Sequence, residues 1–208
     1  MRAITKLIAA VAAGTLLASM GTGAAEAAAP AVPTATDQNV FIFGGRFQAH
    51  WFWDTFEPFT LPYEDNYFLG AGYQQFFLDT DWGVTFGAEV GVGARISFTD
   101  DPSSAEIWAG AVAKFHGFDI FGRFHVTPAL TLGFSHVTAP IGIEAERAET
   151  APKNPSVLIY MGPELAVNSL DDPSLEYFFR IQHRSGGLGA IMDFDGSNAA
   201  TMGVRLKF

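Results

Sequence analysis

The sequence contains no cysteine, so neither a disulfide framework nor a thiolate metal site is available to it. Charged residues are also scarce, at 16% of the 208 residues, which is low for a water-soluble protein. Yet beyond the N-terminal segment there is no unbroken apolar run long enough for a membrane helix. A high apolar content without apolar runs predicts alternation, and hence β-strands. The 20 Phe and 22 Gly point the same way, because Phe favours strands and Gly marks bulges and turns.

Basic residues are few as well, with 12 Lys and Arg against 22 Asp and Glu, which gives a net charge of -10. This balance argues against a nucleic-acid partner. The 5 His are spread over different predicted strands and loops and lack the ligand spacing of a zinc site. We therefore expect neither a bound metal nor another cofactor.

The N-terminus has the pattern of a secretory signal peptide. Arg2 and Lys6 precede an apolar stretch from Leu7 to Ser19 that is too short to span a bilayer, and Ala25-Glu26-Ala27 matches the small-x-small cleavage pattern. We expect a signal peptide over residues 1–27, a flexible lead-in over 28–38 and a single exported domain over 39–208.

Alternating apolar and polar residues predict eight strands in that domain. Their ranges are 39–53, 66–78, 83–98, 105–115, 123–135, 157–167, 175–185 and 198–208. Pro128 and Pro163 lie within two of them, and a bulge or break is expected at each because proline cannot donate to a ladder. With both ends of the domain on the periplasmic side, the external connections would be 54–65, 99–104, 136–155 and 186–197, and the inner ones 79–81, 116–122 and 168–174. All the external connections except 99–104 are longer than every inner one, and 136–155 has no regular pattern. Eight strands without a helix between them predict an antiparallel up-and-down β-barrel, in which closure removes the edges.

The two faces of the strands differ in size and charge. In 83–98 one face is apolar, and the other carries Glu89 and Arg95 among glycines, which suits a narrow interior. In the first strand Phe41, Phe43, Phe47, Trp51 and Trp53 share a face, and bulky aromatic faces suit lipid. We therefore predict a transmembrane barrel of the outer-membrane type; the alternative is a secreted lipocalin-like barrel. The charged residues predicted to face inward are Glu89, Arg95, Arg123, Glu164, Glu176, Arg180 and Arg205. They could line a pore or form a salt-bridged plug, and eight strands favour the plug because the interior is only wide enough for side chains.

The strand 175–185 combines an apolar face of odd-numbered residues with a mostly charged even-numbered face, and His183 and Ser185 continue the apolar one. Ten residues of a tilted strand climb roughly 23 Å, so both lie near the outer boundary of the lipid-facing wall. At i, i+2 their Cβ atoms are about 6–7 Å apart, within reach for an imidazole and a hydroxyl. A Ser activated by a His is the minimal pair for acyl transfer. His-x-Ser alone is a weak signal, because such residues are usually part of a polar rim.

Several stretches resemble the lipid A deacylase (PagL-like, acyloxyacyl hydrolase) family of outer-membrane barrels. They are residues 64–68, 87–95, 106–108, 179–186 and 203–208, within a likeness that covers about 39–208. The resemblance implies an outer-membrane esterase that removes the 3-O-linked acyl chain of lipid A in lipopolysaccharide. It implies Ser185 as nucleophile and His183 as base, with membrane lipids around the barrel.

The chain departs from the family at two positions. Gly186 stands where the family has an oxyanion Asn, and Gly196-Ser197-Asn198 stands where it has the Glu that orients the His. We expect Asp193 or Asp195 to replace the acid, and the amides of Gly186 or Gly187, with Asn198, to form the oxyanion and substrate side. These departures leave two hypotheses: a lipid A deacylase that is slow or inactive, or a non-catalytic barrel that has a structural role or presents loops 54–65 and 136–155 to a partner. The sequence leaves the oligomeric state open.

Overall fold

The computed structural model describes residues 38–56 and 62–208. The predicted signal peptide over 1–27 and nearly all of the lead-in lie outside the described residues; Gln38, predicted to end the lead-in, already begins the first strand.

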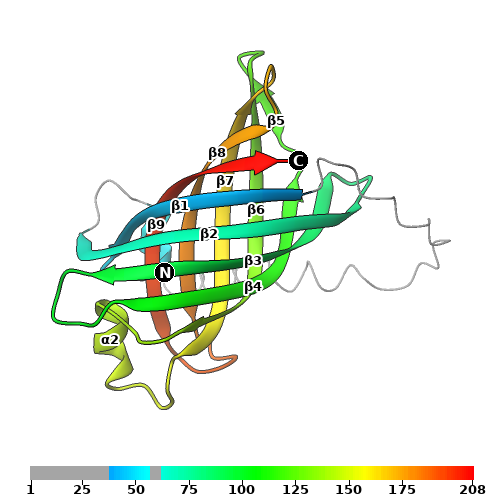
Figure 1. Ribbon diagram of the computed structural model, residues 1–208. Helices are drawn as coiled ribbons and strands as arrows, with labels where there is room; N and C mark the ends of the chain where they lie inside the picture. Colours follow the sequence, from blue (N-terminus) through cyan, green and yellow to red (C-terminus); the bar gives the residue numbers. More distant parts are fainter. Residues whose placement is uncertain (1–37, 57–61) are drawn as a thin grey trace, which may run out of the picture. The chain divides into compact units, whose positions relative to one another are not determined.

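A closed antiparallel sheet makes up this part of the chain (Figure 1). Its strands are β1 (Gln38–Gln48), β2 (Tyr63–Asp79), β3 (Val84–Ser97), β4 (Ser104–Phe115), β5 (Phe118–Ile120), β6 (Phe124–Val137), β7 (Val157–Ser169), β8 (Leu175–Ser185) and β9 (Asp195–Lys207). Each long strand pairs with its neighbours in sequence, β1 pairs with β9, and pairing of β4 with β6 closes the ring, so that β5 is only a short ribbon on β6. The predicted eight-stranded up-and-down barrel is therefore confirmed. No helix within 38–56 or 62–208 is long and apolar enough to cross a bilayer.

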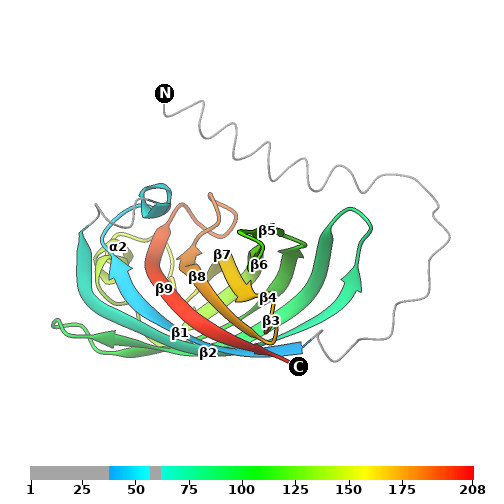
Figure 2. The ribbon, with the colours of Figure 1, turned by 90° about the horizontal axis from the view of Figure 1, so that it is seen from above.

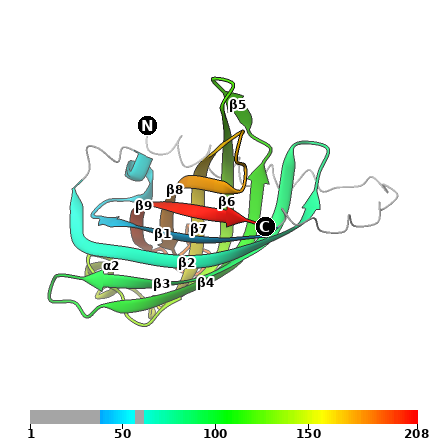
Figure 3. The ribbon, with the colours of Figure 1, turned by 45° about the horizontal axis from the view of Figure 1, so that its top comes forward.

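The two ends of the barrel differ. At one end β1 starts and β9 finishes, and the Phe208 amide donates to the Gln38 carbonyl at 2.9 Å. The other end carries the 3₁₀ helix η2 (Phe52–Phe56) and the short α-helix α2 (Ile143–Ala148). Figures 2 and 3 show both helices at the end of the barrel away from the chain end marked C. The long connections thus gather at the end opposite the chain termini of the barrel, as predicted.

The outer wall of the barrel is apolar. Side chains exposed along the strands include Ile42, Leu69, Val90, Val92, Ile107, Leu132, Phe134, Leu165, Tyr177, Met202 and Leu206. An apolar exterior over a polar interior is the arrangement of barrels that face lipid.

Ion pairs run through the lumen. Arg180 bridges Glu89 and Glu164, Arg205 bridges Glu164 and Glu176, and all these side chains are buried. Lys114 and Lys207 both lie 3.5 Å from Glu176 at the end of the barrel that carries the termini. This continuous network agrees with the plug rather than the pore. Arg123, predicted to belong to it, is instead exposed and precedes β6.

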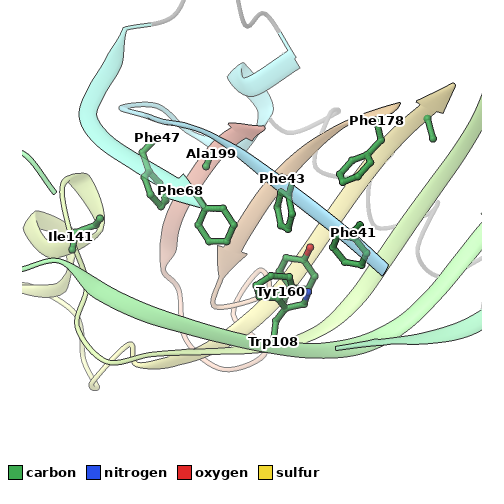
Figure 4. Close-up of a cluster of buried hydrophobic side chains, with 10 residues drawn as sticks. Phe41, Phe43, Phe47, Phe68, Trp108, Ile141, Tyr160, Phe178 and Ala199 are labelled. Carbon is green, nitrogen blue, oxygen red and sulfur yellow. The ribbon is translucent and has the colours of Figure 1, made fainter. Parts of the chain in front are cut away.

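Aromatic side chains fill the rest of the lumen (Figure 4). Phe41, Phe43 and Phe47 are buried there, so the prediction that the aromatic face of the first strand meets lipid is wrong. The reason is the small residues opposite them: a Cβ on Gly72 would collide with the Phe41 ring, and one on Gly70 would lie 2.8 Å from Phe43. Glycines on β2 make room for rings from β1, so the aromatic side chains fit inside.

Three further expectations need correction. Trp51 and Trp53 lie beyond β1, in the connection that holds η2. The connection 136–155, predicted to be irregular, contains α2. β6 runs through Pro128 without a register shift, because Pro128 lies in the gap between the pairings of β6 with β5 and with β4. At Pro163 the expected break is present, since the β7–β8 ladder is interrupted between Met161 and Glu164.

Candidate active site on the outer wall

The alternation of β8 decides which way His183 points. Its neighbours Gln182 and Arg184 face the lumen, where Gln182 donates to Glu106 at 3.1 Å and Arg184 pairs with Glu144 at 3.2 Å. Successive side chains of a strand lie on opposite faces. His183 therefore lies on the outer face, at the end of the barrel opposite the chain termini, as predicted.

A β-bulge lies beside the predicted nucleophile. His183 is opposite Asn198 and Arg184 is opposite Ser197, but Ser185 is opposite Asp195, so Gly196 is skipped. A Cβ on Gly196 would lie 2.5 Å from the Arg184 carbonyl oxygen, so the close approach of the two backbones requires glycine here. Bulges next to active sites redirect side chains, and this one sets the position of Ser185 at the end of the ladder.

A chain of hydrogen bonds links Asn198, His183 and Ser185. His183 Nδ1 lies 2.6 Å from Asn198 Oδ1, and His183 Nε2 lies 3.0 Å from Ser185 Oγ. The amide of Asn198 is oriented by a second bond, because its Nδ2 donates to the His50 carbonyl at 3.0 Å and a carbonyl can only accept. Oδ1 must then accept from Nδ1–H, which leaves Nε2 as the basic nitrogen facing the hydroxyl. This tautomer is the one that a Ser-His pair needs for acyl transfer.

The expected acid partners do not contact the imidazole. Asp195 is held by Arg147, whose Nη1 lies 3.5 Å from its carboxylate, and Asp193 is exposed. Asn198, expected on the substrate side, occupies the orienting position instead. The correction follows from the register, which places Asn198 directly across the ladder from His183.

The backbone amides of Gly186 and Gly187, the two predicted oxyanion donors, differ in whether they are free to bind a substrate. The Gly186 amide donates to the Phe194 carbonyl at 2.7 Å and is therefore not available to a substrate. The Gly187 amide points toward Ser185 Oγ, at 3.4 Å, and Gly187 has a φ of 67° that suits glycine. Of the two predicted donors, Gly187 is the one placed to bind charge that develops near the nucleophile.

The connection between β1 and β2 covers the imidazole. The Phe52 ring lies 4.4 Å from the His183 ring, centroid to centroid, and His183 is only 4% exposed, whereas Ser185 is partly exposed. The base is thus shielded from water while the hydroxyl stays accessible. Phe52 could not be predicted as part of the site, because its place over His183 depends on how a loop folds back across β9.

Comparisons with known proteins bear on the fold. No protein-family model and no curated protein matches the chain. Among solved structures, the barrel is similar to the outer membrane enzyme PagL, with a TM-score of 0.54 and 12% identity over 82% of this chain and 99% of that one. It is also similar to Neisserial surface protein A (NspA), with a TM-score of 0.50 and 12% identity over 83% of this chain and 97% of that one. The chain has the outer-membrane β-barrel fold. At this identity the likeness concerns the fold alone, so the function has to be argued from the site.

Proposed function

We propose that the protein is a serine esterase of the outer membrane that removes the 3-O-linked acyl chain from lipid A of lipopolysaccharide. The observation that carries the proposal is the Asn198–His183–Ser185 chain of hydrogen bonds on the outer face of the barrel. The apolar wall beneath it supports a membrane location. The site shares its end of the barrel with η2 and α2, and the longer connections of outer-membrane barrels are external, which supports an outer-leaflet lipid as substrate.

The geometry supports a two-step hydrolysis. Neutral His183 takes the proton of the Ser185 hydroxyl through Nε2 while Oγ attacks the ester carbonyl carbon, and the Gly187 amide stabilises the oxyanion. His183 then protonates the sugar alkoxide as it leaves, and the acyl chain remains on Ser185. Water, deprotonated by the same nitrogen, releases the fatty acid and restores the hydroxyl. Asn198 holds the tautomer throughout but, unlike a carboxylate, carries no charge to stabilise the imidazolium, so a slow enzyme is expected.

Mass spectrometry of lipid A tests the proposal. Cells that express the wild-type chain should lose one hydroxyacyl group from lipid A, and cells that express Ser185→Ala should not. Ser135→Ala, which removes a buried hydroxyl of β6, is the matched control and should leave the deacylation intact. Identical acyl patterns for the wild type and Ser185→Ala would reject the proposal, provided that both proteins reach the membrane in equal amounts.

A non-catalytic barrel is the second candidate, and one observation favours it: an amide rather than a carboxylate accepts from His183 Nδ1. In that case the connections predicted over 54–65 and 136–155 would carry the function by binding a partner. Changes in these connections would then alter the phenotype of a deletion strain, whereas Ser185→Ala would not.

A further inference from the structure

The helix α2 contacts the lumen side of the same two strands that carry the site on their outer side. Glu144 of α2 is completely buried. It accepts from Ser197 Oγ at 2.7 Å and from Arg95 Nη2 at 2.6 Å, and it lies 3.2 Å from Arg184 Nε. Ser197 and Arg184 are opposite each other across β8 and β9. One carboxylate therefore joins the pair of residues that directly follows the His183–Asn198 pair in the ladder.

A second side chain of α2 contacts the bulge itself. Arg147 Nη1 donates to the carbonyl of Asp195 at 2.9 Å and to the carbonyl of Gly196 at 3.0 Å. Its guanidinium lies 4.7 Å from the centre of the Trp51 ring, in the connection that also covers the site. These carbonyls belong to the two residues at which the register of β9 shifts relative to Ser185.

We propose that α2 positions the nucleophile, with Glu144 and Arg147 acting as positioning residues that hold the bulge at Gly196. The bulge sets how the end of β8, with Ser185, pairs with β9, and it is formed by residues that α2 binds, Asp195, Gly196 and Ser197. Strand ends fray when nothing holds them, and Ser185 is the last residue of β8. The proposal rests on the proposed hydrolysis for its role in catalysis, but the structural coupling from α2 to His183 can be tested without it.

Other buried carboxylates supply a matched control. The Glu164 side chain is almost as deeply buried as that of Glu144 and pairs with both Arg180 and Arg205, but it binds neither the bulge nor Arg184. Glu144→Gln and Glu164→Gln therefore remove the same charge from similar surroundings. A purely structural role for Glu144 predicts similar effects of the two changes on the site, whereas a positioning role predicts different ones.

The experiment compares these variants, refolded in detergent, by two readouts. The first is kcat and KM for ester hydrolysis, with Ser185→Ala as the blank. A displacement of about 1 Å can reduce the rate about 100-fold, so we expect Glu144→Gln to lower kcat by that order while KM changes little, and Glu164→Gln to leave both close to wild type. The second is the pair of ring ¹⁵N chemical shifts of His183, which report its tautomer and its hydrogen bonds to Asn198 and Ser185. They should change in Glu144→Gln and stay unchanged in Glu164→Gln.

The two readouts separate the proposals. A wild type that hydrolyses nothing would count against the proposed function, and the ¹⁵N shifts would then decide the role of α2. Unchanged His183 shifts and an unchanged kcat in Glu144→Gln would overturn the positioning role, as would equal effects of the two glutamate variants. Should Glu144→Gln fail to fold, Arg147→Met takes its place, because Arg147 is partly exposed and its removal leaves the buried ion pairs intact. The same shift changes are expected for it, and unchanged shifts would refute the proposal.

Discussion

At the scale of single residues, Asn198 determines which nitrogen of His183 carries the proton. It does so because its own amide is fixed by the His50 carbonyl. Replacement by alanine frees the imidazole to change tautomer and orientation, and loss of the correct tautomer in a Ser-His pair costs orders of magnitude in rate. We predict that Asn198→Ala lowers kcat at least about 100-fold with little change in KM. Steady-state kinetics would measure this.

The matched control is Asn168→Ala, which removes a buried asparagine side chain of β7 that contacts Lys207 near the opposite end of the barrel. It should leave the kinetics unchanged. Full activity of Asn198→Ala would mean that His183 does not depend on this bond.

Leu188 is a second residue of interest, because its backbone conformation lowers the stability of the barrel. Its φ is 55° and its side chain is 85% exposed, so it adopts a left-handed conformation without burying its apolar surface. The left-handed conformation costs a residue other than glycine roughly 1–2 kcal/mol, and replacing Leu188 by glycine removes this cost. Glycine also has more conformational freedom in the unfolded chain, which offsets about half of that stabilisation. We predict that Leu188→Gly raises the free energy of unfolding by about 0.5–1 kcal/mol, measured by urea titration. Leu170→Gly, in a turn without a left-handed leucine, should not stabilise the barrel.

At the scale of elements, the bulge of β9 depends on Gly196. A Cβ there would meet the Arg184 carbonyl oxygen at 2.5 Å and Leu158 Cδ1 at 3.0 Å, and a paired backbone carbonyl cannot move aside cheaply. We predict that Gly196→Ala lowers the free energy of unfolding by about 1–3 kcal/mol, together with a loss of hydrolysis because Ser185 is displaced. Gly44→Ala, whose nearest atom would be the Phe68 carbonyl oxygen at 3.1 Å, should have a smaller effect on stability and none on hydrolysis. Urea unfolding curves of the two variants would measure the difference in stability.

The helix α2 is held in place by the buried carboxylate of Glu144, whose charge depends on pH. Burial would raise the pKa of Glu144, but Arg95, Arg184 and the hydroxyl of Ser197 lower it below its ordinary value. Because the pKa in the folded state lies below that in the unfolded state, the stabilisation is complete above the unfolded pKa and is lost as the pH falls through the folded one. We predict that α2 loses hydrogen-exchange protection before the barrel strands do when the pH falls from about 7 to about 3.

Glu144→Gln should abolish the pH dependence of α2, whereas Glu146→Gln, which changes an acid of the same helix that has no ion pair with Arg95 or Arg184, should keep it. Equal pH dependence in all three proteins would show that another group controls the helix.

Individual elements show what the sequence could and could not predict. β8 was predicted with the bounds 175–185, because its alternation is unbroken, and the outward direction of His183 followed from parity together with the charges on the even-numbered face. α2 could not be predicted, because a six-residue helix has little intrinsic stability and is held by the tertiary contacts of Glu144 and Arg147. Asn198 was predicted as a site residue, but its role depends on which residue of β9 lies opposite His183. That register is set by the loop between β8 and β9 and by the bulge, and it cannot be read from the alternation of the sequence.

At the scale of the whole molecule, alternation distinguishes two faces but does not say which one meets lipid. In β3 the charged face identifies the lumen, and that prediction is correct for Glu89 and Arg95. In β1 the face of Phe41 and Phe43 is the inner one, because the rings pack against glycines of β2, and the register between β1 and β2 brings those residues together. The interior is therefore a mixed filling of rings and ion pairs, and both kinds of group are needed to fill it.

Breaking an ion pair in the lumen should cost more stability than breaking one on the surface. Arg180 is buried between Glu89 and Glu164, so Arg180→Met leaves the Glu89 carboxylate without its cation away from water, while Glu164 keeps its pair with Arg205. Breaking such a pair by removing one partner typically costs about 3–5 kcal/mol. Arg46 and Asp65 also form a pair at 3.0 Å, but their side chains are 40% and 68% exposed, and such a pair contributes at most about 1 kcal/mol. We predict that Arg180→Met lowers the urea midpoint of unfolding several times more than Arg46→Met, with tryptophan fluorescence as the readout. Equal shifts would mean that water reaches the lumen and screens its charges, and the barrel would then be a pore and not a plug.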